Sequence, residues 1–162
     1  MQKIRDTTKL KLTIEPDNNL KCWANSSYAV HQDMKSHTGI FVTIGKGASY
    51  LTSCKPQLNT KSSTEAELVA VYDKMGQILW TKHFLAAQGV HISMATIYQD
   101  NKSTILLAEN GWTSSSNRTR PLNVRDFFIT DKLKNGEVKV SFCFTTNMLA
   151  DFFTKQLCIT KV

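Results

Sequence analysis

The order in which two hydrophobic periods follow one another constrains the fold of this chain more than any other feature. Apolar and polar residues alternate at 10–14 and again at 20–28, a pattern typical of half-buried strands. The turn-forming residues 15–19 separate these segments, so the sequence predicts a β-hairpin there. Residues 38–52 predict two further strands, broken at Gly45-Lys46-Gly47. The first third of the chain is therefore predicted to form strands.

A long helix is predicted directly after these strands. Ser62 with Glu65, and Thr64 with Glu67, form two overlapping capping boxes, a residue pairing that begins many helices. Apolar residues then recur at helical spacing, and Gly89 is placed to end the helix. The hydrophobic period therefore changes from two to 3.6 near Ser62.

The remainder of the chain alternates between the two periods. In order, the predicted elements are a strand at 95–99, a helix at 102–109, a polar loop at 113–117, a helix at 122–134, a strand at 138–144, and a final helix through Phe153 that Asn147 caps. Strands and helices in this order predict a mixed sheet flanked by helices, in the α/β class.

Composition restricts the kind of protein. A chain of 162 residues is about one domain. No apolar run approaches the roughly 18 residues needed to span a bilayer, and the charged start lacks the apolar stretch of a secretory signal. The four cysteines form no CxxC pair, so we expect reduced thiols rather than a zinc site or a redox dithiol. The formal net charge of +7 is common in proteins that bind phosphates or acidic partners.

Three acidic residues stand out by their placement. Glu67 lies in the first turn of the long predicted helix, Asp100 ends a short apolar strand, and Asp151 lies in the otherwise apolar final helix. Each has an ordinary structural explanation: Glu67 as a helix-dipole partner, Asp100 as a helix cap and Asp151 as a solvated helix residue. Together, on a basic chain, they suggest a metal-binding cluster of carboxylates.

Several ordered motifs give the chain a family resemblance. The segments are Thr60-Lys61-Ser62-Ser63-Thr64-Glu65-Ala66-Glu67-Leu68, Tyr98-Gln99-Asp100-Asn101-Lys102-Ser103 and Leu149-Ala150-Asp151-Phe152-Phe153-Thr154-Lys155, with Ser27-Tyr28-Ala29-Val30-His31 and Lys35-Ser36-His37-Thr38-Gly39 upstream. At this spacing they resemble the ribonuclease H domain of copia-type (Ty1/copia, Pseudoviridae) LTR retrotransposon Pol polyproteins. The likeness spans about residues 20–157. Residues 1–19 look like a connector or leading strand from a reverse transcriptase, and residues 158–162 are a tail.

The resemblance implies a fold, a reaction and a metal site. The fold is ribonuclease H-like, a five-stranded mixed sheet flanked by helices on both faces. The reaction is hydrolysis of the RNA strand of an RNA–DNA hybrid, with two Mg²⁺ (or Mn²⁺) ions held by an Asp-Glu-Asp-Asp quartet. Carried onto this sequence, the quartet includes Glu67, Asp100 and Asp151, with Glu65 as the competitor for the helix position. Mg²⁺ takes oxygen ligands, and a pair of such ions activates water and stabilises the leaving oxygen.

The first aspartate of the quartet is missing. Its position, two residues before the Ser27 run, holds Asn25, which offers one neutral carbonyl oxygen in place of a charged carboxylate. The nearby Asp33 falls where the family already has an aspartate, so it is not a replacement. We expect weaker metal binding and impaired cleavage. The chain also departs from the family pattern at Pro121, Asp126, Phe144 and Gln156.

Basic residues are the expected contacts with nucleic acid. Two stretches without acidic residues contain them, and the resemblance makes them phosphate contacts of salt-dependent binding, with RNA recognised through 2′-hydroxyls. The basic residues assigned this role are Lys46, Lys55, Lys61, Arg118, Arg120 and Arg125. Asn101, directly after Asp100, is assigned to nucleic-acid binding with them. Without the resemblance, such runs are usually solvated faces. His31, Asp33 and His37 match no usual zinc spacing, so hydrogen-bonding histidines are favoured there over a metal cluster.

Three functions follow as hypotheses. The first is an RNA–DNA hybrid endoribonuclease; the second is a catalytically inactive module, or decayed relic, of the same fold that binds hybrid or duplex. The third, a DNA integrase or transposase, is disfavoured because its glutamate follows both aspartates, whereas Glu67 precedes Asp100 and Asp151. The expected partners are an RNA–DNA hybrid and a reverse transcriptase domain of the same or another polyprotein, with no membrane and no small-molecule cofactor. The expected location is inside the cell, in the cytoplasm or nucleus, or in a virus-like particle.

Overall fold

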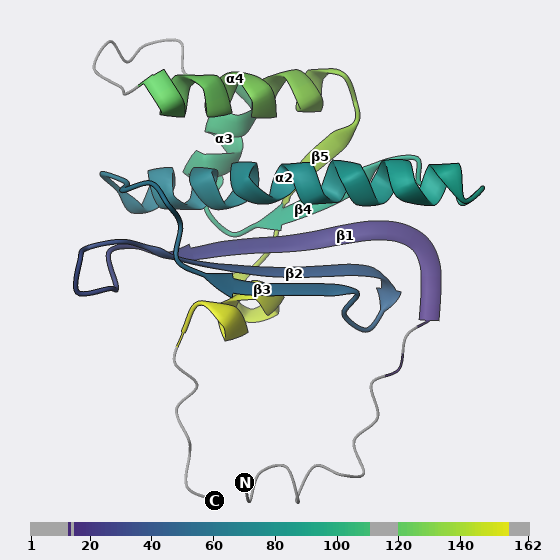
Figure 1. Cartoon of the computed structure of the whole chain (residues 1–162), viewed down its shortest axis with the longest axis horizontal. Coiled ribbons are helices and arrows are strands. Elements are labelled where there is room, and N and C mark those ends of the chain that lie inside the picture. The colour runs from purple at the N-terminus through teal and green to yellow at the C-terminus, as the bar shows by residue number, and fades with distance from the viewer. Residues whose placement is uncertain (1–12, 14, 111–119, 156–162) are drawn as a thin grey trace, which may run out of the picture.

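A mixed five-stranded sheet forms the centre of the molecule (Figure 1), in a computed structural model that describes residues 13, 15–110 and 120–155. The strand order is β3-β2-β1-β4-β5. The strands are β1 (Glu15–Ser27), β2 (His37–Lys46), β3 (Tyr50–Cys54), β4 (Ala95–Gln99) and β5 (Val138–Phe142). Within these ranges, no helix combines the length and apolar character that a membrane crossing requires. The predicted α/β class and five-stranded mixed sheet are confirmed.

The central strand β1 joins the antiparallel and parallel halves of the sheet. It runs antiparallel to β2, which runs antiparallel to β3, and it runs parallel to β4, which runs parallel to β5. In this register Asn25 lies opposite Gly39 of β2, and Trp23 lies beside Tyr98 of β4. The carboxyl ends of β1 and β4 therefore meet at one edge of the sheet.

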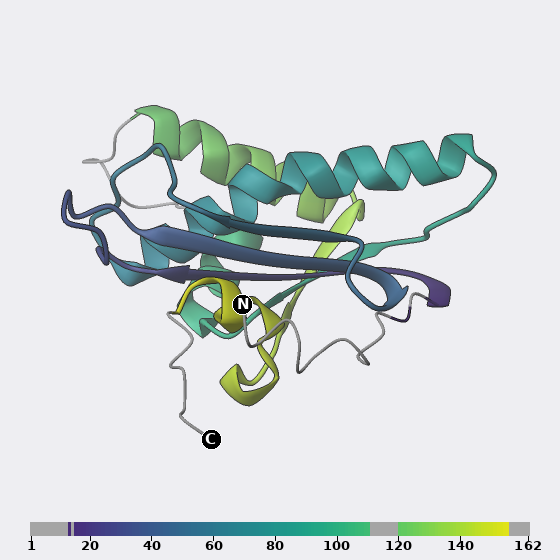
Figure 2. The ribbon, with the colours of Figure 1, turned by 60° about the horizontal axis from the view of Figure 1, so that its bottom comes forward.

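Three α-helices of the described ranges lie largely to one side of this sheet (Figure 2). They are α2 (Ser63–Ala87), α3 (Lys102–Asn110) and α4 (Arg120–Lys134). The core forms where α2 packs on the sheet; its buried residues include Ala24, Ile40, Leu68, Met75, Ile97, Ile129 and Val140. Burial on this scale supplies the main driving force for a domain of this size.

Local chemistry accounts for both ends of α2. The Ser62 hydroxyl accepts a hydrogen bond from the Glu65 backbone N–H at 3.2 Å, so the first of the two capping boxes begins the helix. The Glu65 carboxylate supplies the other half of the capping box. It accepts a hydrogen bond from the backbone N–H of Lys61, the residue before the cap residue Ser62, at 2.7 Å. At the other end Gly89 has a φ of +81°, and the Val90 N–H donates to the Leu85 carbonyl. This is a Schellman motif, as the sequence predicted.

The opposite face of the sheet carries two short 3₁₀ helices, η1 (Thr145–Asn147) and η2 (Leu149–Phe153). Gly39 makes the approach of η2 possible. A Cβ added at this position would lie 2.6 Å from the Ala150 carbonyl oxygen and 2.7 Å from Thr154 Cγ2. Phe153 also contacts the Phe41 ring, at 6.4 Å between centroids. The sheet is thus covered on both sides, as predicted.

Three sequence-based predictions about elements are wrong. Residues 15–19 do not reverse the chain but lie within β1, where the register with β2 is irregular between Pro16 and Lys21 and Asn18 has a φ of +59°. The final strand ends at Phe142, so Phe144 is not part of it. The last helix is 3₁₀ rather than α, and Asn147 ends η1 instead of capping η2, which begins without a side-chain cap.

Two further predictions concern residues that the structure does not describe. The strand at 10–14 and the polar loop at 113–117 lie outside the described residues. The division of the chain at residues 19 and 157 stays a prediction, and β1 begins at Glu15, before the first of these points. Among the described cysteines, Cys22, Cys54 and Cys143 are free thiols.

Candidate active site

Four elements bring the predicted site residues to the same edge of the sheet. Asn25 is near the end of β1, and Asp100 directly follows β4, which runs parallel to β1. Glu67 lies in the first turns of α2, against the sheet, and Asp151 lies in η2 on the opposite face. The contacts described below connect all four positions.

Glu67 is the most deeply buried carboxylate of this group, with 6% of its surface exposed. Burial, with a smaller contribution from the neighbouring charges of Asp100 and Asp151, raises the pKa of Glu67 to about 8. Two hydrogen bonds act in the opposite direction, from the Ser26 backbone N–H and from the Gln99 side-chain amide, at 3.1 Å. Glu67 therefore shares an electrostatic environment with both aspartates.

Asn25 joins β1 to η2. Its amide nitrogen donates to Asp151 Oδ1 and, at 3.0 Å, to the Thr154 hydroxyl. Its carbonyl oxygen accepts from the Ser26 N–H at 2.8 Å, the same backbone group that hydrogen-bonds Glu67. An aspartate at this position would have no amide hydrogen to donate, so the observed bond to Asp151 depends on asparagine.

Both aspartates also have donors of their own. Lys155, one helical turn beyond Asp151, forms an ion pair with Asp151 Oδ2. The Thr145 hydroxyl donates to Asp100 Oδ2 at 2.9 Å. Asp100 does not cap α3, because the Asn101 side chain accepts from the Ser103 and Thr104 N–H groups at that helix start. These contacts thus partly offset the negative charge of Asp100 and Asp151.

The side chains fit a hard divalent cation by their chemistry. Glu67, Asp100 and Asp151 offer only oxygen ligands, the type that Mg²⁺ and Mn²⁺ prefer. Glu67, whose pKa is raised mainly by burial and further by the charges of Asp100 and Asp151, would be stabilised in its charged form by a cation. As the side chains stand, no three His, Cys, Asp or Glu residues of the described ranges are arranged as a metal-binding group. Lys155 and Asn25 hold Asp151 instead.

Of the predicted nucleic-acid contacts, Lys55, Lys61 and Asn101 lie around the start of α2 and α3, and Arg125 lies on α4. Lys55 and Arg125 line one pocket of about 490 Å³. Lys55 pairs with Asp33 at 2.6 Å, while Arg125 pairs with Asp73 at 3.0 Å and lies over the Tyr72 ring. Asp33 is therefore a partner of Lys55, away from Asn25.

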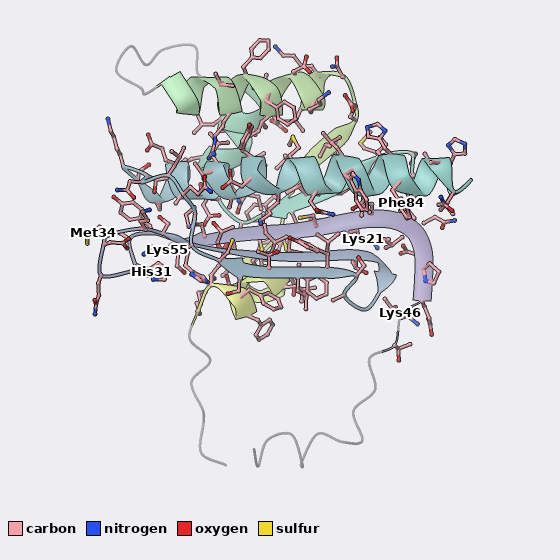
Figure 3. The ribbon with its side chains drawn as sticks, in the orientation of Figure 1. Lys21, His31, Met34, Lys46, Lys55 and Phe84 are labelled. Atoms are coloured by element: carbon pink, nitrogen blue, oxygen red, sulfur yellow. The ribbon has the colours of Figure 1, made fainter. Side chains whose placement is uncertain are left out.

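The structure does not bring all the predicted contacts together. Lys46 pairs with Glu15 at 2.7 Å and lies at the other end of the sheet from Lys55 (Figure 3). Arg118 lies outside the described residues, as does the side chain of Arg120. The assignment of all seven residues to nucleic-acid binding remains a prediction.

Sequence reasoning missed five residues of this cluster. They are Ser26, Gln99, Thr145, Thr154 and Lys155. Two of them carried a readable signal, since Gln99 directly precedes Asp100 and Lys155 is four residues after Asp151, the spacing of a helical ion pair. Thr145 carried none, because its contact with Asp100 exists only through the tertiary fold.

Sequence comparison relates the chain to parts of much longer proteins. It is 31% identical over 121 residues to a retrovirus-related Pol polyprotein from transposon TNT 1-94 of Nicotiana tabacum, covering 75% of this chain and 9% of that protein. It is 27% identical over 146 residues to a Ty1-LR3 Gag-Pol polyprotein of Saccharomyces cerevisiae, covering 90% of this chain and 8% of that protein. The chain thus spans about a tenth of the length of these relatives. No family model matches it.

Structure comparison identifies the fold. LC11-RNase H1, isolated from compost by a metagenomic approach, superposes with a TM-score of 0.62 at 11% identity, over 84% of this chain and 92% of that one. A foamy viral protease-reverse transcriptase in complex with an RNA/DNA hybrid superposes with a TM-score of 0.58 at 16% identity, over 91% and 21%. At these identities the likeness concerns the fold alone.

Proposed function

Because this chain is a ribonuclease H-like domain homologous to the Pol polyproteins of copia- and Ty1-type retrotransposons, we propose that it binds RNA–DNA hybrids and descends from an endonuclease that cleaves their RNA strand. One observation carries the proposal. The fold places Asn25, Glu67, Asp100 and Asp151, which come from four separate elements, around the end of β1. A buried glutamate with a raised pKa beside two aspartates is an arrangement that is frequent at functional sites.

Glu67, Asp100 and Asp151 are the residues that would hold Mg²⁺ or Mn²⁺. When bound, such ions supply activation of water and stabilisation of the leaving oxygen in phosphodiester hydrolysis. The chain itself contributes the burial of Glu67, the orientation of its carboxylate by Gln99 and Ser26, and the Thr145 bond to Asp100. These contacts fix the carboxylates on rigid elements before substrate binds.

Cleavage by the natural sequence is impaired in this proposal. Asn25 lacks the charge of a fourth carboxylate, and its amide holds Asp151 together with Lys155. The same contacts favour a second candidate function, a module that binds hybrid without cutting it. In either case the substrate partner is an RNA–DNA hybrid, and a reverse transcriptase domain is the protein partner. The activity belongs inside the cell, in the cytoplasm or nucleus, or in a virus-like particle.

Hybrid cleavage by matched variants tests the proposal. The full chain, Asn25→Asp, and Asn25→Asp combined with Asp100→Asn are assayed on a labelled hybrid in Mg²⁺ and in Mn²⁺. We expect little or no cleavage by the natural chain and a gain of about tenfold or more for Asn25→Asp, the lower end of what a supporting residue contributes to a metal site. The added Asp100→Asn change should abolish that gain. Asp131→Asn, on α4, is the control and should change nothing.

Each other outcome separates the candidates. Strong cleavage by the natural chain that Asp100→Asn abolishes would contradict impairment at Asn25. Salt-sensitive hybrid binding without cleavage by any variant would support the binding module. Neither binding nor cleavage would leave a folded relic and refute both functions.

A further inference from the structure

A second concave site adjoins the carboxylates, and its described lining contains none of the residues assigned to nucleic-acid binding. It is a pocket of about 610 Å³, within the range of about 300–1,000 Å³ typical of small-ligand sites. Its walls come from the β1–β2 connection, from β3 and from η2 with the residues that follow it. The lining residues that matter below are His31, His37, Ser53, Phe152 and Lys155. Figure 3 locates His31 in the β1–β2 connection, at the end of the sheet that also carries Lys55.

The pocket is continuous with the candidate active site. Lys155 lines the pocket and forms the ion pair with Asp151. Thr154 also lines it, and its hydroxyl accepts the Asn25 amide at 3.0 Å. A nucleic acid strand bound at the carboxylates would therefore place an adjacent nucleotide at the mouth of this pocket.

A chain of hydrogen bonds with a defined direction forms one wall. The Ser53 hydroxyl donates to the Phe153 carbonyl at 2.7 Å, so it must accept from His37 Nε2, at 2.8 Å. Burial and the neighbouring His31 both lower the pKa of His37, which favours its neutral ring. A neutral His37 with its proton on Nε2 accepts at Nδ1 from His31 Nε2, at 3.0 Å. His31 Nδ1 lies outside this chain of hydrogen bonds, and a proton on it would let it donate to a phosphate.

The lining selects for an anion with a flat apolar part. Lys155 supplies an ammonium group that it shares with Asp151, so a phosphate bound here would become its second partner. Among the described residues, the side chains that line the pocket include no aspartate or glutamate. Phe152, 61% exposed, and Val30, 56% exposed, provide apolar surface that the fold does not cover. A phosphate beside an unpaired base matches this combination, because unpaired bases stack on aromatic side chains and phosphates pair with lysine.

We propose that this pocket binds one unpaired nucleotide of the polynucleotide strand next to the candidate active site, with its phosphate at Lys155 and His31 and its base against Phe152. This inference rests on the proposed function, since it assigns part of the same substrate to a further site. A nucleotide in a strand and a free nucleoside monophosphate share this chemistry, and the experiment distinguishes them.

Affinity for hybrid tests the strand-bound form. A labelled RNA–DNA hybrid with a single-stranded RNA extension is titrated by fluorescence anisotropy in EDTA, so that metal binding does not contribute. Phe152→Ala should weaken binding about fivefold or more, the lower bound for loss of one base–aromatic stack. His31→Ala should also weaken binding, through loss of a phosphate contact. The controls are Phe84→Ala and His91→Ala, an exposed aromatic and an exposed imidazole, and they should bind as the natural chain does. Figure 3 shows Phe84 at the opposite end of the sheet from His31.

The imidazole NMR signals of His31 and His37 test the pocket independently of the hybrid. Uridine monophosphate should shift both signals, and it should do so more than inorganic phosphate or uridine alone. Unchanged hybrid affinity in Phe152→Ala and His31→Ala would overturn the strand site while leaving the proposed function intact. If the natural chain fails to bind hybrid but uridine monophosphate shifts the signals, the proposed function fails and the pocket binds free nucleotide. Shifts with an acidic peptide and none with uridine monophosphate would overturn the proposal in favour of a protein partner.

Discussion

Among single residues, Glu67 couples the stability of the domain to its candidate chemistry. Its pKa in the folded chain is about 8, against an ordinary value near 4.5, because burial penalises the charged carboxylate. Folding therefore takes up a proton between these two pH values. The stabilising effect is complete below about pH 4.5 and is lost as the pH rises toward 8.

We expect Glu67→Gln to remove this pH dependence. In the natural chain the free energy of unfolding should fall by a few kcal/mol between about pH 5 and 8, because each pH unit in this interval changes it by about 1.4 kcal/mol per proton taken up. Urea denaturation at pH 5, 6.5 and 8 measures it. The variant should be the more stable protein at pH 8, and millimolar Mg²⁺ should stabilise only the natural chain there. Equal slopes for Glu67→Gln and the natural chain would contradict the assignment; Glu109→Gln, an exposed acid on α3, is the control.

The sequence predicted the residues of the site better than their arrangement. Motif resemblance selected Glu67, Asp100 and Asp151, and the fold does bring these positions together. It did not predict that Asn25 and Lys155 occupy the oxygens of Asp151, because those contacts require η2 to lie against the end of β1. Side-chain partners of this kind depend on tertiary packing, which motif spacing does not encode.

At the scale of elements, the close packing of η2 on β2 positions Asp151. Gly39 lies opposite Asn25, and any side chain at this position would meet the backbone of Ala150. The absence of a Cβ at one residue of β2 thus sets the distance between the sheet and the helix that carries a candidate ligand.

Gly39→Ala should displace η2. We expect a loss of about 1–3 kcal/mol in the free energy of unfolding, typical of overpacking. Placed on the Asn25→Asp background, it should also remove the hybrid cleavage that Asn25→Asp gains. Gly76→Ala is the matched control, because a Cβ there meets nothing within 4 Å and alanine favours a helix by up to about 1 kcal/mol. Equal stabilities for the two alanine variants, measured by urea denaturation, would contradict this role of Gly39.

Element boundaries were predictable where local chemistry decides them. Ser62 and Gly89 mark the ends of α2, and the strand at 95–99 has the predicted limits. The error at 15–19 has a physical reason: the Asp17 side chain accepts from the Asn19 N–H, a turn-like bond that is equally compatible with a bulge in a long strand. Pairing with Gly45 and Lys46 decides between the two, and a local pattern does not contain that information.

For the whole molecule, the net charge of +7 makes ionic strength the main external control on nucleic-acid binding. Several of the described lysines and arginines are already paired with acids, among them Lys46, Lys55 and Arg125. The number of phosphates contacted should therefore be well below the number of basic residues.

We expect hybrid affinity to fall about 40–150-fold between 50 and 200 mM salt, which corresponds to three or four phosphate contacts. Anisotropy titrations in EDTA at four salt concentrations measure the slope. Lys61→Gln should lower the slope by about one contact, whereas Lys134→Gln, an exposed lysine at the end of α4, should leave it unchanged. Binding that does not vary with salt would contradict a phosphate-based mode.

The central place of β1 in the sheet also sets the order in which the chain can fold during its synthesis. The β1–β2–β3 meander is complete by Cys54, but Lys21 of β1 pairs with Thr96 of β4, about 75 residues later. At about 5–20 residues per second, a ribosome needs on the order of 4–15 s to supply that partner. Throughout this interval one edge of β1 has unpaired backbone groups, a template for pairing with other chains. Translation products that stop before β4 are therefore expected to aggregate, while chains that pass it close the sheet.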